Sequence, residues 1–112
     1  MNRITVRRAT DPVDWVPIEG DVPPVGEEVV DFKSGDGRFA VGLWRRDPEE
    51  GPMVLSEYHE VMYILEGRVE ITEDDGTVHQ VGPGDLVVAP LGATARWRAI
   101  EPVRKVWAIY RE

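Results

Sequence analysis

The sequence contains no cysteine and only two histidines, His59 and His79. The absence of cysteine excludes disulfide bonds, zinc–thiolate sites and cysteine nucleophiles. A metal site built from imidazole groups would have at most these two histidines as ligands in each chain. Histidine-rich metal chemistry is therefore restricted before any motif is considered.

Long apolar segments and positive charge are also scarce. No apolar run approaches the roughly 18 residues of a transmembrane helix, and residues 1–6 lack the continuous apolar stretch of a signal peptide. The 13 Lys and Arg residues stand against 21 Asp and Glu residues, which gives a net charge of −8. Such a surface repels phosphate backbones and anionic lipids. We therefore expect a cytoplasmic protein whose partners include neither nucleic acid nor a membrane.

The chain has 112 residues, which is enough for one domain with one hydrophobic core but not for a two-domain enzyme. Its 11 glycines and 9 prolines are spread along the whole length, a pattern typical of short strands joined by turns. The four prolines between residues 11 and 26 forbid a continuous helix or central strand there. We predict an extended proline-rich arm over residues 1–26, anchored by Trp15 and Val16, and a barrel over residues 27–112.

From residue 37 onward, apolar and polar residues alternate with the period of two that is typical of strands. The alternating segments are 39–44, 58–65, 68–72, 77–81, 86–88, 95–100 and 103–110. Turn signals separate several of them, at Glu66-Gly67, at Asp75-Gly76 and at residues 82–85. No segment has an apolar stripe with the helical period of about 3.6 residues. The sequence therefore predicts an all-β, single-domain antiparallel barrel or jelly roll.

Two segments carry a resemblance to a known fold family. In residues 60–67 a glutamate stands before a turn glycine, and residues 84–92 contain Gly-Asp, an apolar strand and Pro-Leu-Gly. Together these segments resemble the two signature motifs of the cupin superfamily. Trp44, Trp97 and the pair Arg104-Lys105 are similar to positions in short cupin domains of the ureidoglycine aminohydrolase and ethanolamine-utilisation protein Q type. The resemblance implies an RmlC-like jelly roll over most of the chain.

The resemblance also implies where a metal would bind. Metal-binding cupins take ligands from His-x-His and Glu in the first motif and from a further His after Pro-x-Gly, because imidazole and carboxylate suit divalent transition metals. Only Glu60 remains of this set, since the histidine positions hold other residues: Val54 and Ser56, or Met53 and Leu55, and then Ala95. One carboxylate does not hold Mn, Fe, Ni or Zn by itself, because catalytic metal sites usually keep about three protein ligands.

A bulge in the strand around Glu60 would offer a second route to a metal. Side chains alternate between the two faces of a regular strand, so Glu57 and His59 point away when Glu60 points into the barrel. A bulge would reverse this and let Glu57, His59 and Glu60 converge on Mn, Ni, Zn or Fe as non-standard ligands. Otherwise His59 lies at the barrel rim or in a subunit contact, and no cofactor is certain. We expect His79, in a polar hairpin strand, to be solvated.

The same alternation indicates which side chains share an internal cavity with Glu60. Ser56, Tyr58, Met62 and Ile64 lie on its face of the strand, and the facing of Lys105 depends on the strand register. We predict a mainly aromatic ligand pocket with few charges, formed by Trp44, Tyr58, Glu60, Met62, Trp97 and Lys105. Its ligand would be a small organic molecule with a carboxylate or an amine as its polar group. The tryptophans could instead be ordinary core residues.

The opposite face of the Glu60 strand is apolar as well. It carries Val61, Tyr63 and Leu65, so both faces of the strand need to be covered. Either the proline-rich arm or a second subunit could cover the outer face. Because cupins often pair sheet to sheet, the resemblance implies a homodimer.

Three functions are compatible with these features. The favoured one is a small-molecule-binding cupin with an aromatic pocket around Glu60 and degenerate metal ligands. The alternative is a metal-dependent enzyme that acts on a small nitrogenous acid, which the resemblance to ureidoglycine aminohydrolase implies. The third is an accessory or regulatory domain that acts through its dimer surface. The sequence leaves open whether the chain is an enzyme.

Overall fold

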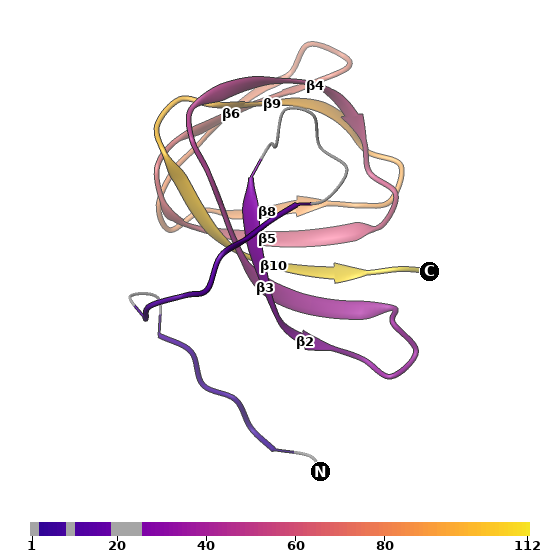
Figure 1. Cartoon of the computed structure of the whole chain (residues 1–112). Helices are drawn as coiled ribbons and strands as arrows, with labels where there is room; N and C mark the ends of the chain where they lie inside the picture. Colours follow the sequence, from indigo (N-terminus) through magenta and orange to yellow (C-terminus); the bar gives the residue numbers. More distant parts are fainter. Residues whose placement is uncertain (1–2, 9–10, 19–25) are drawn as a thin grey trace.

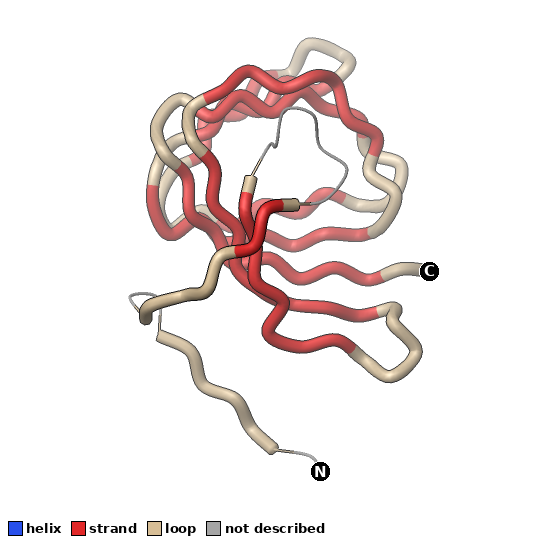
Figure 2. Tube along the Cα trace, in the orientation of Figure 1, coloured by secondary structure: helices blue, strands red, loops and turns tan. Residues whose placement is uncertain are grey.

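A computed structural model describes residues 3–8, 11–18 and 26–112 of the chain. These residues form strands, turns and loops and contain no helix (Figure 2). The strands are β1 (Val16–Pro17), β2 (Glu27–Lys33), β3 (Phe39–Arg46), β4 (Glu49–Leu55), β5 (His59–Glu66), β6 (Val69–Glu73), β7 (Val78–Val81), β8 (Leu86–Ala89), β9 (Thr94–Ala99) and β10 (Val103–Tyr110). Within the described ranges, no helix is long and apolar enough to cross a membrane.

The strands form two sheets that face each other as the walls of a barrel (Figure 1). One sheet has six strands in the order β1-β2-β3-β10-β5-β8, and the other has four in the order β4-β9-β6-β7. Every strand pair is antiparallel. The all-β antiparallel jelly roll predicted from the sequence is therefore confirmed.

All the predicted strands are present, and the structure adds the two-residue β1 within the arm and the longer β2 and β4, which the sequence pattern did not reveal. Both β2 and β4 contain a register shift, which breaks the period of two. The shift in β2 lies between Val30 and Phe32, and the shift in β4 lies between Glu50 and Met53. The β4 shift includes Pro52, which is tolerated because β4 is at the edge of its sheet. Irregular pairing therefore explains why both strands were missed.

Part of the proline-rich arm lies within the described residues. Val16–Pro17 pair with the start of β2, so backbone hydrogen bonds hold this part of the arm. The Trp15 ring lies between two guanidinium groups, with its centroid 4.5 Å from Arg45 Cζ and 5.5 Å from Arg104 Cζ. These cation–π contacts hold Trp15 on the barrel. Residues 1–2, 9–10 and 19–25 of the arm lie outside the described residues.

The described part of the arm does not cover the outer face of β5. It joins the six-stranded sheet next to β2, whereas β5 and β8 lie toward the opposite edge of that sheet. Val61 and Tyr63 on the outer face of β5 are 42% and 44% exposed. The sequence suggested two possible covers for this face, the arm and a second subunit. The described residues of the arm do not cover it.

The hydrophobic core consists of two clusters joined by neighbouring side chains of β5. Ile64 packs with apolar side chains of β6, β7, β9 and β10, and Met62 packs with Ala40 and Trp107. Met62 and Ile64 are each only 1% exposed. The inward face of β5 is therefore the common wall of the core, which fixes the position of the next inward residue on this strand, Glu60.

Gly42 lies where β2, β3 and β10 are in close contact. A Cβ atom on Gly42 would lie 1.9 Å from the carbonyl oxygen of Val29 and 2.8 Å from Cζ2 of Trp107. Both distances are far below van der Waals contact, and the first obstacle is backbone. Glycine at this position therefore lets Trp107 lie flat against β3 on the inside of the barrel.

We expect Gly42→Ala to lower the free energy of unfolding by about 2–4 kcal/mol, because the strands must separate to admit the methyl group. Gly35→Ala is the matched control, since a Cβ there meets nothing within 4 Å, and we expect a change below about 0.5 kcal/mol. Urea denaturation of both variants measures the difference. Equal stability of the two variants would contradict the packing described for Gly42.

Candidate functional site

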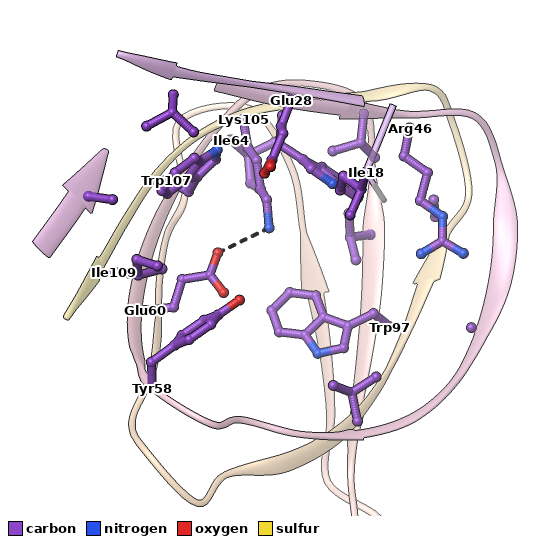
Figure 3. Close-up of a pocket in the computed structure, with 18 of the residues that line it drawn as sticks. Ile18, Glu28, Arg46, Tyr58, Glu60, Ile64, Trp97, Lys105, Trp107 and Ile109 are labelled. Atoms are coloured by element: carbon purple, nitrogen blue, oxygen red, sulfur yellow. Dashed lines mark hydrogen bonds and ion pairs between the residues drawn. The ribbon is translucent and has the colours of Figure 1, made fainter. Parts of the chain in front are cut away.

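A cavity of about 690 Å³ lies between the two sheets. Its walls include three tryptophans, Trp44, Trp97 and Trp107, which come from β3, β9 and β10. Figure 3 shows Tyr58, Glu60, Trp97 and Lys105 pointing into the same space. The cavity therefore combines a large aromatic surface with charged side chains.

The strand register explains why these side chains meet. Lys105 of β10 is opposite Trp44 of β3 and Ile64 of β5, and Ile109 is opposite Glu60. Directly opposed residues in a sheet project to the same face, so all of these side chains point inward. The facing of Lys105, which the sequence could not determine, thus follows from its pairing with Trp44.

Lys105 and Glu60 form an ion pair inside the cavity. Lys105 Nζ donates to Glu60 Oε2 at 3.4 Å, and the two side chains are 13% and 20% exposed. The same nitrogen lies 3.0 Å from Met62 Sδ. It also lies 4.5 Å from the centroid of the Trp44 ring and 5.6 Å from that of the Trp97 ring. The Lys105 cation is therefore balanced by one carboxylate and by the faces of two indoles.

Burial changes the protonation chemistry of two cavity residues. It lowers the pKa of Lys105, and the nearby Arg46 charge adds to this effect, whereas the Glu60 carboxylate opposes it. Burial raises the pKa of the Tyr58 hydroxyl, and the charge of Glu60 raises it further. Compared with the same groups in water, Lys105 and Tyr58 are therefore both shifted toward their neutral forms. Both lie near the carboxylate of Glu60.

Two further cavity residues carry buried donors without a hydrogen-bond partner among the described residues. They are Arg46, through Nε and Nη2, and Trp107, through Nε1. Glu49 Oε2 lies 3.1 Å from Arg46 Nη2 and offsets its charge, but without the geometry of a hydrogen bond. The Arg46 side chain is only 9% exposed. Buried donors of this kind normally have an acceptor.

The structure brings most of the predicted pocket residues together. Five of them line the cavity: Trp44, Tyr58, Glu60, Trp97 and Lys105. Met62 is different, because it is buried in the core and contacts Lys105 through its sulfur.

The expectation of few charges needs correction. Two charged residues, Glu60 and Lys105, were predicted in the cavity. Six charged residues line it: Glu28, Lys33, Arg46, Glu60, Lys105 and Arg111. Glu28 and Lys33 belong to β2, which was not predicted. Arg46 could have been found, because it stands two residues after Trp44 and so shares its face; the predicted strand ended too early.

The three proposed metal ligands do not converge. Residues 59–64 of β5 pair regularly with β10, so the bulge that the metal hypothesis needs is absent there, and His59 and Glu60 point to opposite faces. The His59 ring bonds elsewhere: Nε2 lies 2.7 Å from Glu112 Oε2, and Nδ1 accepts the Leu91 N–H at 3.0 Å. Glu57 is exposed. In the described part of the chain, no group of three or more His, Asp or Glu side chains is placed to hold a metal ion.

Two of the other positions implied by the cupin resemblance, Val54 and Ala95, cannot bind a metal through their side chains. Val54 is exposed and Ala95 is buried, and neither side chain has a donor atom. His79 lies on the surface of β7, where Nε2 is 2.9 Å from Glu73 Oε2. The donor set around Glu60 is therefore a lysine, a tyrosine and indoles, which suits an organic ligand better than a divalent cation.

Comparison with known proteins identifies the family. Residues 33–107 match the family model of the EutQ-like cupin domain, Cupin_3. This segment contains β3–β9, most of β10 and most of the charged cavity residues. No curated protein is similar enough to count as a match.

Solved structures agree with this match. A DUF861 family protein from Thermotoga maritima is 38% identical over 61% of this chain and 76% of that chain, with a TM-score of 0.58. A putative ethanolamine utilization protein Q from Salmonella typhimurium shares the fold, with 20% identity, a TM-score of 0.73, and coverage of 86% of this chain and 77% of that chain. A DUF861 family protein of unknown function from Pseudomonas syringae has 25% identity and a TM-score of 0.77 over 87% of this chain and 44% of that chain. The chain therefore belongs to the EutQ-like cupin domain family.

Proposed function

We propose that this cupin binds a small organic acid in its barrel cavity and does so without a resident metal. The observation that carries the proposal is the set of buried donors, Arg46 Nε, Arg46 Nη2 and Trp107 Nε1, that make no hydrogen bond among the described residues, although Arg46 Nη2 has the Glu49 carboxylate 3.1 Å away as an ion-pair partner. An unpaired buried donor costs about 1–3 kcal/mol. A ligand carboxylate or carbonyl oxygen in the cavity would remove this cost.

The charges around the cavity support an acidic ligand. Four cationic side chains line it, against two carboxylates, although the whole chain has a net charge of −8. The cavity is therefore locally positive in a negative protein. Arginine is well suited to this role because its planar guanidinium group can donate two parallel hydrogen bonds to one carboxylate.

The size and walls of the cavity support a ligand with an apolar portion. A volume of about 690 Å³ lies within the usual range of about 300–1,000 Å³ for small-molecule sites. The indoles of Trp44, Trp97 and Trp107 provide flat surfaces for that portion, and the polar groups fix its orientation. Aromatic walls with few polar groups are the common composition of such sites.

One test of the acid-binding proposal uses Arg46. In a thermal-shift screen of small mono- and dicarboxylic acids, we expect at least one acid to raise the melting temperature of the wild type, because a ligand selective for the native state stabilises it. We expect Arg46→Met to weaken that acid by about tenfold or more, as the loss of a charge-assisted hydrogen bond of about 1.5–3 kcal/mol requires.

Arg45→Met is the matched control for this test. Arg45 is the next residue on β3, faces outward and bonds Glu27 through Nη2 at 2.8 Å. We expect it to bind the acid as tightly as the wild type does. Equal loss in both variants, or stabilisation by amines and neutral analogues instead of acids, would rule out the acid-binding proposal.

A second prediction follows from the lowered pKa of Lys105. Because the unfolded chain holds a proton on this lysine up to its ordinary pKa of 10.5, the folded state binds fewer protons over the alkaline range below that value. The Lys105 contribution to stability therefore rises with pH in that range. We expect the free energy of unfolding of the wild type, minus that of Lys105→Met, to increase between neutral pH and about pH 10.

Denaturation curves at several pH values measure this difference. Lys33→Met is the control, because it removes the same functional group at an exposed position; only a difference that Lys33→Met does not share is attributed to the burial of Lys105. Parallel stability curves for the wild type and Lys105→Met would show that burial does not affect the protonation of Lys105.

We also propose that a second copy of the chain covers the outer face of β5 and β8. The outward residues there are apolar and exposed: Val61 (42%), Tyr63 (44%), Leu86 (64%) and Val88 (63%). They are contiguous because Val61 is opposite Val88 and Tyr63 is opposite Leu86. β8 is also an edge strand of its sheet. Contiguous apolar surface of this kind supports an interface, here a symmetric homodimer.

Light scattering at micromolar concentration tests the homodimer. We expect the wild type to have twice the chain mass of 12.6 kDa and Val88→Glu to have the single-chain mass, because burial of an unpaired carboxylate in an apolar interface is unfavourable. Val78→Glu is the control, since Val78 is 51% exposed on β7, an edge strand of the other sheet. A wild type of single-chain mass, or dimers in all three proteins, would contradict the proposed interface.

A further inference from the structure

The chain contains only two lysines, Lys33 and Lys105. Lys33, at the end of β2, borders the same cavity but is exposed to water. The Lys105 side chain is 13% exposed and lies inside the cavity (Figure 3). The same functional group is therefore present once where it is exposed to water and once where it is largely buried.

The surroundings of Lys105 suit a nucleophilic amine. The rings of Trp44 and Trp97 lie 4.5 Å and 5.6 Å from Nζ. Burial lowers the pKa of Lys105, so a larger share of the amine is neutral than in water. Among the described residues, two groups contact Nζ at hydrogen-bond range, Glu60 Oε2 and Met62 Sδ. Since an amine nitrogen has more bonding capacity than these two contacts use, room remains on the cavity side for a ligand atom.

Proton transfer groups stand next to this amine. Glu60 Oε2, at 3.4 Å, is within reach of the proton that Lys105 must lose before it attacks. Figure 3 shows the Tyr58 hydroxyl directed toward the same part of the cavity as Glu60 and Lys105, and this hydroxyl stays protonated because burial raises its pKa. A base and an acid therefore stand beside one nucleophile.

From this geometry we propose that Lys105 forms a reversible covalent imine with a carbonyl compound that enters the cavity. The ligand class is an aldehyde or a 2-oxo acid. For the 2-oxo acid the inference rests on the proposed function, because Arg46 would hold the carboxylate while Lys105 takes the carbonyl carbon. For a neutral aldehyde it rests on the Lys105 surroundings alone.

The step balances with the groups present. Glu60 accepts a proton from the Lys105 ammonium, and the free electron pair of Nζ forms a bond to the carbonyl carbon. The π electrons of the C=O bond move to oxygen, which takes the proton of the Tyr58 hydroxyl, and the Tyr58 oxygen takes the second proton of the nitrogen to give a carbinolamine. Glu60 then returns its proton to the carbinolamine hydroxyl, the C–O bond breaks with release of water, and the nitrogen electron pair forms the C=N bond of a protonated imine. The reaction consumes one amine and one carbonyl and releases one water, with no change of oxidation state.

Chemical trapping tests the inference. We would incubate the wild type at neutral pH with pyruvate, or in parallel with propionaldehyde, in the presence of sodium cyanoborohydride, which reduces an imine to a stable secondary amine. Peptide mass mapping then locates the adduct. We expect about tenfold more adduct on the Lys105 peptide than on the Lys33 peptide, as a desolvated amine beside a base should give.

Variants make the result specific. We expect Arg45→Met, outside the cavity, to be labelled on Lys105 as the wild type is, and Lys105→Arg to lose the adduct while it keeps its cooperative melting transition. If Lys105→Arg does not fold, the wild-type peptide map decides by itself. No adduct with either carbonyl, or equal adducts on Lys33 and Lys105, would overturn the proposal.

The outcomes also separate this inference from the acid-binding proposal. Pyruvate that raises the melting temperature without forming an adduct would overturn the imine and leave acid binding intact. An Arg46→Met variant that still traps propionaldehyde on Lys105 but traps about tenfold less pyruvate would support both. Equal trapping of pyruvate in Arg46→Met and the wild type would support the imine and reject the role of Arg46.

Discussion

The ion pair of Lys105 with Glu60 is the interaction on which the interior of this barrel depends. Two partly buried charges cost several kcal/mol each unless they are paired. Lys105 and Glu60 are the charge partners of each other. The pair is possible only because β3, β10 and β5 are in a register that projects both side chains inward. The indoles on either side of Lys105 and the Met62 sulfur then complete its surroundings. A shift of one residue in any of these strands would point one charge out of the barrel.

This pair also gives Glu60, the glutamate of the cupin motif, a partner other than a metal ion. In a metal-binding cupin, a divalent cation would balance that carboxylate, and histidines would complete the ligand set. Here the Lys105 ammonium group is 3.4 Å from Glu60. Ala95, three residues after Gly92, stands where the resemblance to metal-binding cupins places a histidine. The same carboxylate is thus the partner of an amine, and in the proposed imine formation it would be the proton acceptor.

The fold could be predicted because a period of two and turn glycines are local signals, and β5, β6 and β10 carry them clearly. The faces of β5 followed from the same period, so Tyr58 and Glu60 could be placed together. Three features could not be predicted in this way. The bulges in β2 and β4 hide the period, the facing of Lys105 depends on pairing with distant strands, and the unpaired donors of Arg46 and Trp107 arise only from packing. Each depends on long-range contacts that a single sequence does not encode in a short window.

The negative charge of the chain excludes less than it first suggests. Repulsion between a surface of net charge −8 and a polyanion adds over many phosphates, and it therefore opposes a nucleic acid or a lipid surface strongly. A small acid carries only one or two charges, and at physiological ionic strength exposed charges are screened beyond about 8 Å. Inside the cavity such an acid would meet mainly the nearest groups, which include Arg46, Lys105 and Glu60, among apolar walls that screen poorly. Net charge thus governs which surfaces the protein avoids, whereas the local excess of cations governs what the cavity can hold.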